Sequence, residues 1–182
     1  MIPRALLAAL LSLPLVSPAL AQQAPTSPPK KKPVAVAPRT AAPKAIGTFD
    51  DWIAATHQAA GQPVCYAFTR AQSSMPAVAG RGAVILTVTQ RVSGRDAVAI
   101  EAGFAYAPNA TVNVQADQTG LDFYTHQRAA FARNGHDAVT AFRAAARAIA
   151  RSPGPHEATV TDTFSLKGFT AAYDAISKAC PQ

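Results

Sequence analysis

The chain has 182 residues, of which 49% are hydrophobic and 15% charged, and its formal charge is +7 at pH 7. This length suits one domain with flanking segments. Most of the excess positive charge lies before residue 47, so residues 47–182 are nearly neutral, with 11 Lys and Arg against 10 Asp and Glu. A near-neutral domain argues against specific nucleic-acid binding, which concentrates positive charge on the folded part.

Residues 1–21 are typical of a cleaved secretory signal peptide. Arg4 precedes an apolar stretch from Ala5 to Val16, and Ala19-Leu20-Ala21 places small residues where signal peptidase cuts. The apolar stretch is shorter than the roughly 20 residues that a membrane-spanning helix needs. We therefore expect a mature chain that is periplasmic or secreted and has no transmembrane segment.

Residues 22–46 form a second segment, which is rich in Pro, Ala and Lys and contains no Asp or Glu. Such a segment cannot bury enough apolar surface to offset its ordering entropy, so a disordered linker is predicted. Its positive side chains are candidates for contact with anionic peptidoglycan, lipopolysaccharide or phospholipid. They are Lys30, Lys31, Lys32, Arg39 and Lys44. The simpler alternative is a solvated spacer.

Residues 47–182 form the predicted domain. Phe49 and Trp52 are expected to anchor its start in the core. Asp50 and Asp51 are interpreted as a solvated turn, because adjacent residues point to different faces and make a poor carboxylate pair. Further along the chain, β-branched and aromatic residues predict strands separated by turn residues. The predicted strands cover residues 64–69, 83–90, 97–104, 111–116 and 121–125.

The stretch after these strands allows more than one interpretation. Residues 127–134 fit either a strand or a helical turn, and a helix is predicted from Asp137. Local propensity would continue that helix to Ala150. A basic row on one helical face would then consist of Arg143, Arg147 and Arg151.

The last segment of the chain has the periodicity of an amphipathic helix. Its apolar residues recur at spacings of three and four, which places them on one face. They are Leu166, Phe169, Tyr173, Ile176 and Cys180. Ser165 is interpreted as the N-cap of this helix, and Gly168 as a site of close packing or of an unusual backbone angle.

Three motifs resemble those of a known family. The closing sequence DTFSLKGFTAAYDAISKAC (162–180), Phe49-x-x-Trp52 and Pro63-Val64-Cys65-Tyr66 are similar to the invasion-associated locus B family of exported bacterial proteins. The resemblance implies export, a small β-rich domain and a link to host-cell entry, and it brings no catalytic residues. It also favours a helix that ends near residue 145, followed by a hairpin with arms 147–152 and 157–164. We adopt this hairpin over the longer helix.

The chain has two cysteines, Cys65 and Cys180. In an oxidising compartment two thiols most simply form one bridge, and closing a loop of this length is worth roughly 4 to 5 kcal/mol in the chain-entropy model. Two buried thiols or a metal pair remain alternatives. Many members of the family have a cysteine where this chain has Thr56, so a disulfide through that position is absent.

The side chains able to carry chemistry suggest no catalytic, cofactor or metal site. The histidines lack another His or Cys at metal-ligand spacing, and the serines lack the Gly-x-Ser-x-Gly context of a hydrolase. The histidines are His57, His126, His136 and His156, and the serines are Ser73, Ser74, Ser93 and Ser165.

Short strands, antiparallel turns and two helices predict an α+β domain, built on an antiparallel β-sandwich or open barrel with an amphipathic C-terminal helix. The expected function is that of an exported, non-enzymatic envelope or secreted protein that binds a protein or surface partner, in host-cell interaction as the resemblance implies. The alternative is a structural or homeostatic periplasmic factor, held to the anionic envelope by its cationic tail. A third hypothesis is an enzyme whose site is assembled from residues distant in sequence, and no local motif supports it.

Overall fold

The computed structural model describes residues 42–155 and 158–181. The predicted signal peptide and most of the predicted linker therefore lie outside the described residues. The domain is α+β, as predicted, with an 11-stranded antiparallel sheet and two helices. Its first strand begins at Lys44, ahead of the domain start expected at residue 47. Within the described residues, neither helix combines the length and apolar character needed to cross a membrane.

The strands are β1 (Lys44–Phe49), β2 (Trp52–Ala59), β3 (Gln62–Arg70), β4 (Ser73–Met75), β5 (Ile85–Arg91), β6 (Gly94–Glu101), β7 (Thr111–Ala116), β8 (Thr119–His126), β9 (Ala129–Ala132), β10 (Arg147–Pro153) and β11 (Thr159–Ser165). The helices are α1 (Gly135–Ala144) and α2 (Phe169–Ala179). The order in the sheet is β1-β2-β3-β5-β6-β9-β8-β7-β10-β11-β4. Four neighbouring pairs, β3–β5, β6–β9, β7–β10 and β11–β4, therefore join strands that are not consecutive in the chain.

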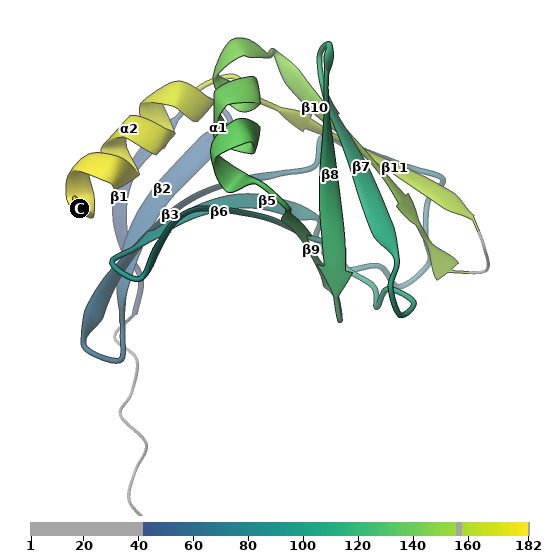
Figure 1. Ribbon diagram of the computed structural model, residues 1–182, viewed down its shortest axis with the longest axis horizontal. Helices are drawn as coiled ribbons and strands as arrows, with labels where there is room; N and C mark the ends of the chain where they lie inside the picture. Colours follow the sequence, from purple (N-terminus) through teal and green to yellow (C-terminus); the bar gives the residue numbers. More distant parts are fainter. Residues whose placement is uncertain (1–41, 156–157, 182) are drawn as a thin grey trace, which may run out of the picture. The chain divides into compact units, whose positions relative to one another are not determined.

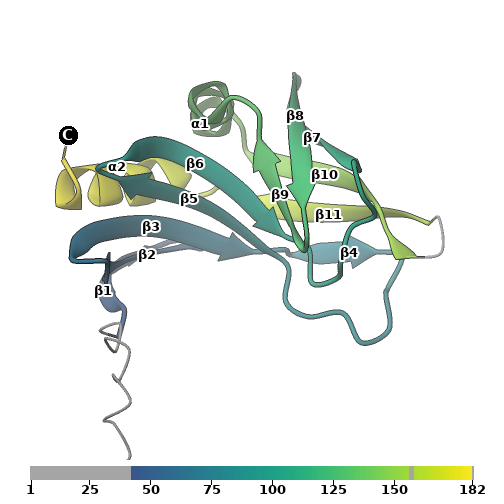
Figure 2. The same ribbon diagram turned by 60° about the horizontal axis from the view of Figure 1, so that its bottom comes forward.

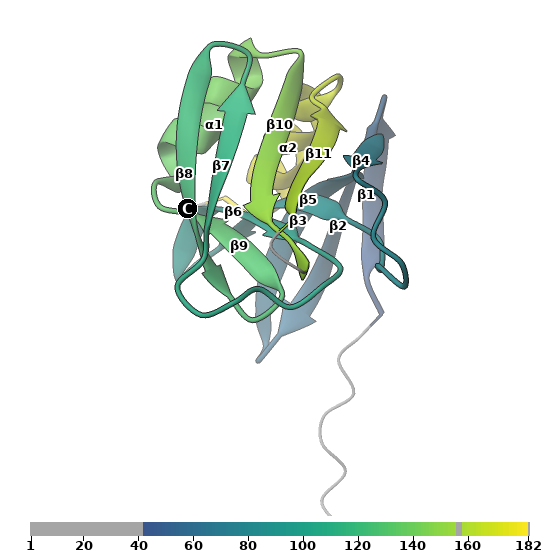
Figure 3. The same cartoon turned by 90° about the vertical axis from the view of Figure 1, so that its right-hand side faces the viewer.

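The sheet curves strongly around both helices (Figure 1). It is not closed, because β1 and β4 each have a single neighbour. A hydrogen bond nevertheless connects β2, near one edge of the sheet, to β11, near the other. The indole N–H of Trp52 donates to the carbonyl oxygen of Ser165 at 3.0 Å. The amide of Gln72, just before β4, donates to the carbonyl oxygen of Thr163 at 2.8 Å and extends the pairing of β4 with β11. An open barrel results, with β7, β10, β11 and β4 forming the wall seen in Figure 3.

The core lies on the inner face of the sheet, where the helices pack. α2 covers β1, β2 and β3, and α1 covers β6. Each helix contributes one aromatic ring to a cluster around the fully buried Trp52. The ring of Phe169 lies 4.9 Å from that of Trp52, and the ring of Phe142 lies 5.6 Å from that of Phe169, both edge-on. Such edge-to-face contacts add to the stabilisation from burial alone.

The apolar face predicted for the closing helix is confirmed. Phe169 and Ile176 of α2 are fully buried, and Leu166 and Cys180 on either side of the helix are nearly so. Tyr173 is half-buried and packs against the same core. The periodicity therefore identified correctly which side of this segment faces the sheet.

The predicted N-cap of that helix is wrong. α2 begins after Gly168, and no side chain caps it. Ser165 instead ends β11, and its Oγ accepts a hydrogen bond from the amide of Lys167 at 3.2 Å. The expectation for Gly168 is confirmed on both counts. Its φ is 87°, and a Cβ there would lie 2.0 Å from the carbonyl oxygen of Phe49.

The hairpin adopted after α1 is confirmed. α1 ends at Ala144, and β10 then pairs with β7 on one side and β11 on the other. Arg147 and Arg151 therefore lie on the outer side of a strand, whereas Arg143 is on α1. The helix that local propensity would continue to Ala150 does not form, because pairing on both sides of β10 outweighs that weak preference.

Other local predictions had mixed outcomes. Asp50 and Asp51 form the β1–β2 turn, as predicted. The ambiguous residues 127–134 contain the strand β9. β1, β2 and β4 had no predicted counterpart, and residues 44–46 of β1 belong to the segment predicted to be a disordered linker. The Ala-rich sequence of β2 has little strand propensity of its own, and it is extended because it pairs with β1 and β3.

Candidate functional site

The outer face of the sheet is a candidate binding surface, because both helices pack on the inner face. Antiparallel register places outward side chains of neighbouring strands opposite one another. One such row crosses β2, β3, β5, β6, β9 and β8, a distance of about 24 Å at the usual spacing of strands. We call it the outer row, and it consists of Ile53, Phe68, Thr87, Ala99, Phe131 and Tyr124.

Both ends of the outer row are apolar and exposed. Ile53 is 41% exposed and Tyr124 is 44% exposed. Tyr124 stacks on Phe131, with ring centroids 5.5 Å apart, and Phe68 stacks on Tyr66 at 6.1 Å. Aromatic surfaces of this kind combine a large apolar area with a polar hydroxyl, which suits them to contact with a partner.

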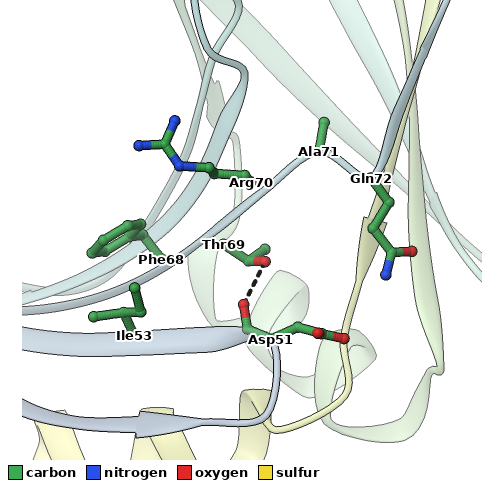
Figure 4. A pocket seen from close by; sticks show the side chains of 7 residues that line it. All are labelled: Asp51, Ile53, Phe68, Thr69, Arg70, Ala71 and Gln72. Atoms are coloured by element: carbon green, nitrogen blue, oxygen red, sulfur yellow. Dashed lines mark hydrogen bonds between the residues drawn. The ribbon is translucent and has the colours of Figure 1, made fainter.

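An open hollow of about 250 Å³ continues the outer row beyond Ile53 and Phe68 (Figure 4). These two side chains lie next to one another on one side of it, and Asp51 and Gln72 contribute polar groups on the other. The hydroxyl of Thr69 donates to the carbonyl oxygen of Asp51 at 2.7 Å, which holds the β1–β2 turn against β3. The hollow therefore adds hydrogen-bonding groups at one end of a mainly apolar row.

A buried ion pair lies between the two halves of the sheet. Two guanidinium nitrogens of Arg81 donate to the carboxylate of Asp162 at 2.7 and 2.8 Å, and the third donates to the carbonyl oxygen of Ala102. The hydroxyl of Ser74 also donates to Asp162, at 2.7 Å. Because these partners satisfy both charges, the pair fixes the segment between β4 and β5 to β11.

A second polar cluster centres on Asp96 of β6. Its carboxylate accepts hydrogen bonds from the hydroxyl of Tyr173 at 2.6 Å and from the side-chain amide of Gln90 at 2.8 Å. Nδ1 of His136 lies 3.5 Å from its other oxygen. Burial by itself raises the pKa of Asp96, but the hydrogen bonds from Tyr173 and Gln90, together with His136, outweigh burial and leave the pKa below its ordinary value. Burial, followed by the hydrogen bond to Asp96, raises the pKa of Tyr173.

The predicted disulfide is present. Cys65 and Cys180 are bonded, with their Cα atoms 5.9 Å apart, and they join β3 to the end of α2. Of the five linker cations, Lys44 is exposed at the start of β1. The other four, Lys30, Lys31, Lys32 and Arg39, lie outside the described residues.

Within residues 42–155 and 158–181, no three His, Cys, Asp or Glu side chains are placed to hold a metal ion. His57 lies on β2 and His126 ends β8. His136 lies beside Asp96 near the start of α1, and His156 is outside the described residues.

Sequence reasoning missed the outer row. A partial signal was present in β3, where Tyr66 and Phe68 alternate with the buried Cys65 and Ala67, so that both faces of the strand are apolar. The row itself depends on the pairing of β6 with β9, which are separated by two other strands in the chain. No local pattern specifies that pairing.

Comparison with known proteins agrees with this architecture. A model of the family described as Invasion associated locus B (IalB) protein matches residues 52–177. No curated protein matches the chain. The crystal structure of invasion associated protein B from Bartonella henselae aligns with a TM-score of 0.55 and 16% identity, over 73% of this chain and 95% of that chain. This structural likeness shows the fold alone. The family model matches more than half of this chain, and the chain therefore belongs to the invasion-associated locus B family.

Proposed function

We propose that the mature chain is an exported protein without catalytic activity that binds a macromolecular partner through the outer row. The observation that supports this best is the exposure of Ile53 and Tyr124 at the two ends of a row that lies on the face opposite the helices. Contiguous exposed apolar surface marks interaction sites in folded proteins. The polar hollow beside Ile53 would add specificity to an otherwise apolar contact.

Family membership supports a partner in the bacterial envelope or on a host cell. Both the family and the structural relative from B. henselae are described as invasion associated. The signal-peptide character of residues 1–21 supports a location in the periplasm or outside the cell, where such partners are met. The partner in this proposal is a protein or another surface component.

A second function is anchoring to the anionic envelope through the linker. Residues 22–46 carry five positive side chains and no negative one, which favours contact with anionic peptidoglycan or lipid. In this alternative the chain is a structural or homeostatic periplasmic factor held in place by its tail. Contacts of this kind weaken as salt is added, because exposed charges are screened.

The first function is tested by capture with the oxidised mature chain, residues 22–182, immobilised and exposed separately to envelope extract and to host-cell surface proteins. The variant I53S/Y124S removes the exposed ends of the outer row. The matched control I149S/M75S removes two apolar side chains from the outer side of β10 and β4, in the other half of the sheet.

We expect the wild type and the control to capture the same partner, and I53S/Y124S to lose it. Equal capture by all three chains would show that the outer row is not the contact. Circular dichroism and thermal unfolding of each variant establish that a loss of capture does not arise from misfolding.

A further inference from the structure

One end of the domain gathers four segments that are distant in sequence. The β2–β3 turn and the β5–β6 turn lie at this end, on the left in Figures 1 and 2. The disulfide from Cys65 to Cys180 brings the end of α2 to the same place. Lys44, where the chain enters β1, pairs with Thr56 three residues from the end of β2. We call this region, residues 42–46, 57–64, 91–95 and 175–181, the basic end.

The basic end carries positive charge without acidic residues. None of its four segments contains Asp or Glu, and its exposed cations are Lys44, Arg91 and Lys178. These three form no ion pair with any described residue. Arg95 is half-buried and donates to the carbonyl oxygen of Cys180 at 2.8 Å. The neighbouring carboxylate of Asp96 accepts hydrogen bonds from Tyr173 and Gln90, as described above.

Between the two turns of the basic end lies an open hollow of about 420 Å³. Its lining is mainly apolar, with Ala59, Ala60, Pro63 and Val64 on the β2–β3 side. Val92, at the tip of the β5–β6 turn, is 72% exposed, the highest exposure of the large apolar side chains in the described domain. An exposed valine next to an arginine at the tip of a turn suits contact with a partner surface that has charged groups on the outside and an apolar layer beneath them.

The opposite end of the same strands differs in its charges. There Lys167 lies 3.1 Å from Asp50, and Arg128 lies 3.5 Å from Glu101. Lys167 and Arg128 therefore have negative partners, although Arg70 at the end of β3 is exposed there and has no ion pair among the described residues. The four segments of the basic end contain no Asp or Glu at all. An anionic surface therefore complements the basic end.

We propose that the basic end docks on an anionic phospholipid surface. Arg91, Lys178 and Lys44 meet the headgroup phosphates, while Val92 and the rim of the hollow reach the boundary of the acyl chains. Combined basic and apolar contact is how peripheral segments bind the membrane interface, and each Lys or Arg near an anionic leaflet strengthens binding about five-fold. The inference rests on the anchoring function proposed for the linker and extends it to the folded domain. Lys44, the last of the linker cations, lies at the start of β1 and belongs to the basic end.

Cosedimentation with vesicles tests this proposal, using the oxidised mature chain at about 0.1 M salt. One set of vesicles contains phosphatidylglycerol in phosphatidylcholine, and the other contains phosphatidylcholine alone. R91Q/K178Q removes two charges from the basic end, and R147Q/R151Q removes the same net charge from the outer side of β10. V92S removes the apolar tip, and I53S/Y124S reports on the outer row.

We expect binding to the anionic vesicles alone. R91Q/K178Q should weaken it about 25-fold, from two charges at about five-fold each, while R147Q/R151Q stays within about two-fold of wild type. V92S should weaken binding several-fold, and I53S/Y124S should leave it unchanged. The result for I53S/Y124S separates lipid binding by the basic end from partner binding by the outer row, so one proposal can be wrong while the other holds.

Three outcomes would overturn the proposal. Equal losses in R91Q/K178Q and R147Q/R151Q would mean that net charge, rather than the basic end, sets the affinity. Full binding by R91Q/K178Q together with its loss when Lys30, Lys31, Lys32 and Arg39 become Gln would assign the contact to the linker alone. Unchanged binding by V92S, with equal sedimentation on peptidoglycan sacculi, would indicate a general polyanion contact and exclude the lipid.

Discussion

The two ends of α2 are held to the sheet in different ways. At its start, Gly168 packs directly on the backbone of Phe49, and the indole of Trp52 bonds to the carbonyl oxygen of Ser165. At its end, the disulfide to Cys65 makes the attachment, supported by the hydrogen bond from Arg95. One end therefore depends on close packing and the other on a covalent bond.

This difference has a consequence for the surface. Close packing at the start of α2 is accompanied by local ion pairs, such as that between Lys167 and Asp50. At the other end the disulfide attaches α2 to the sheet, so the side chains around it are not needed for that attachment. Val92 is exposed there, and so are Arg91 and Lys178, which make no ion pair with described residues. Functional sites in proteins commonly depart from the arrangement that stability alone would favour.

The largest effect is expected from the packed end. Phe169→Ala should lower the free energy of unfolding by roughly 3 to 5 kcal/mol, because the fully buried ring contacts Trp52, Phe142 and Tyr173. Urea denaturation of the oxidised protein measures this. A loss below about 1 kcal/mol would show that α2 contributes little to the core. Phe131→Ala on the outer row is the matched control and should cost much less, because its ring is only partly buried.

The covalent end should give the next largest effect. Cys180→Ser should cost about 2 to 5 kcal/mol under oxidising conditions, because the disulfide joins two residues 115 positions apart in the chain. Strong reductant should bring the wild type most of the way to the stability of the variant, and Cys65→Ser should behave like Cys180→Ser. Two free thiols in the folded, non-reduced protein, detected by mass spectrometry, would contradict this account.

A smaller, pH-dependent effect is expected from Asp96. Its lowered pKa means that the folded state favours the carboxylate, so its contribution is present above the pKa of the unfolded chain and is lost as pH falls through the folded pKa. Asp96→Asn should cost about 1.5 to 3 kcal/mol at pH 7, because charge-assisted hydrogen bonds are lost. Asn tolerates the positive φ of 55° at this position.

Denaturation of the wild type and of Asp96→Asn at several pH values tests this expectation. The difference in unfolding free energy should shrink as the solution becomes acidic below about pH 4. Tyr173→Phe should remove part of the same pH dependence. A constant difference from pH 7 to pH 2 would show that the charge of Asp96 is not stabilised by the fold.

The smallest effect is expected from the unpaired charges of the basic end. R91Q/K178Q should change the free energy of unfolding by less than about 0.5 kcal/mol, as is usual for exposed residues without partners. The same variant should strongly weaken binding to anionic vesicles. The two measurements together distinguish side chains that stabilise the fold from side chains that bind a ligand. A large loss of stability would mean that these side chains hold the structure and are not reserved for a ligand.

Several features followed from local sequence. The apolar face of α2 was readable because helical periodicity is a property of one continuous segment. β7 was predicted with its observed bounds, since it alternates cleanly and is followed by a tight turn. The disulfide required only a count of two cysteines and an oxidising compartment.

Other features were decided by the tertiary structure. β2 has an Ala-rich sequence and is extended because its neighbours in the sheet pair with it. Gly168 rather than Ser165 precedes α2. A side chain does not fit at Gly168, because the carbonyl oxygen of Phe49 would lie 2.0 Å from a Cβ there. Neither contact has a signature within a few residues of the positions concerned.

The candidate binding surfaces show most clearly which features local sequence predicts and which depend on the tertiary structure. The sequence by itself identified the cations of residues 22–46 and the apolar character of β3, because composition and alternation are local. The outer row required the pairing of β6 with β9, and the basic end required four separate segments to meet. Contacts between segments far apart in the chain depend on the register and curvature of the whole sheet, which no single stretch of sequence specifies.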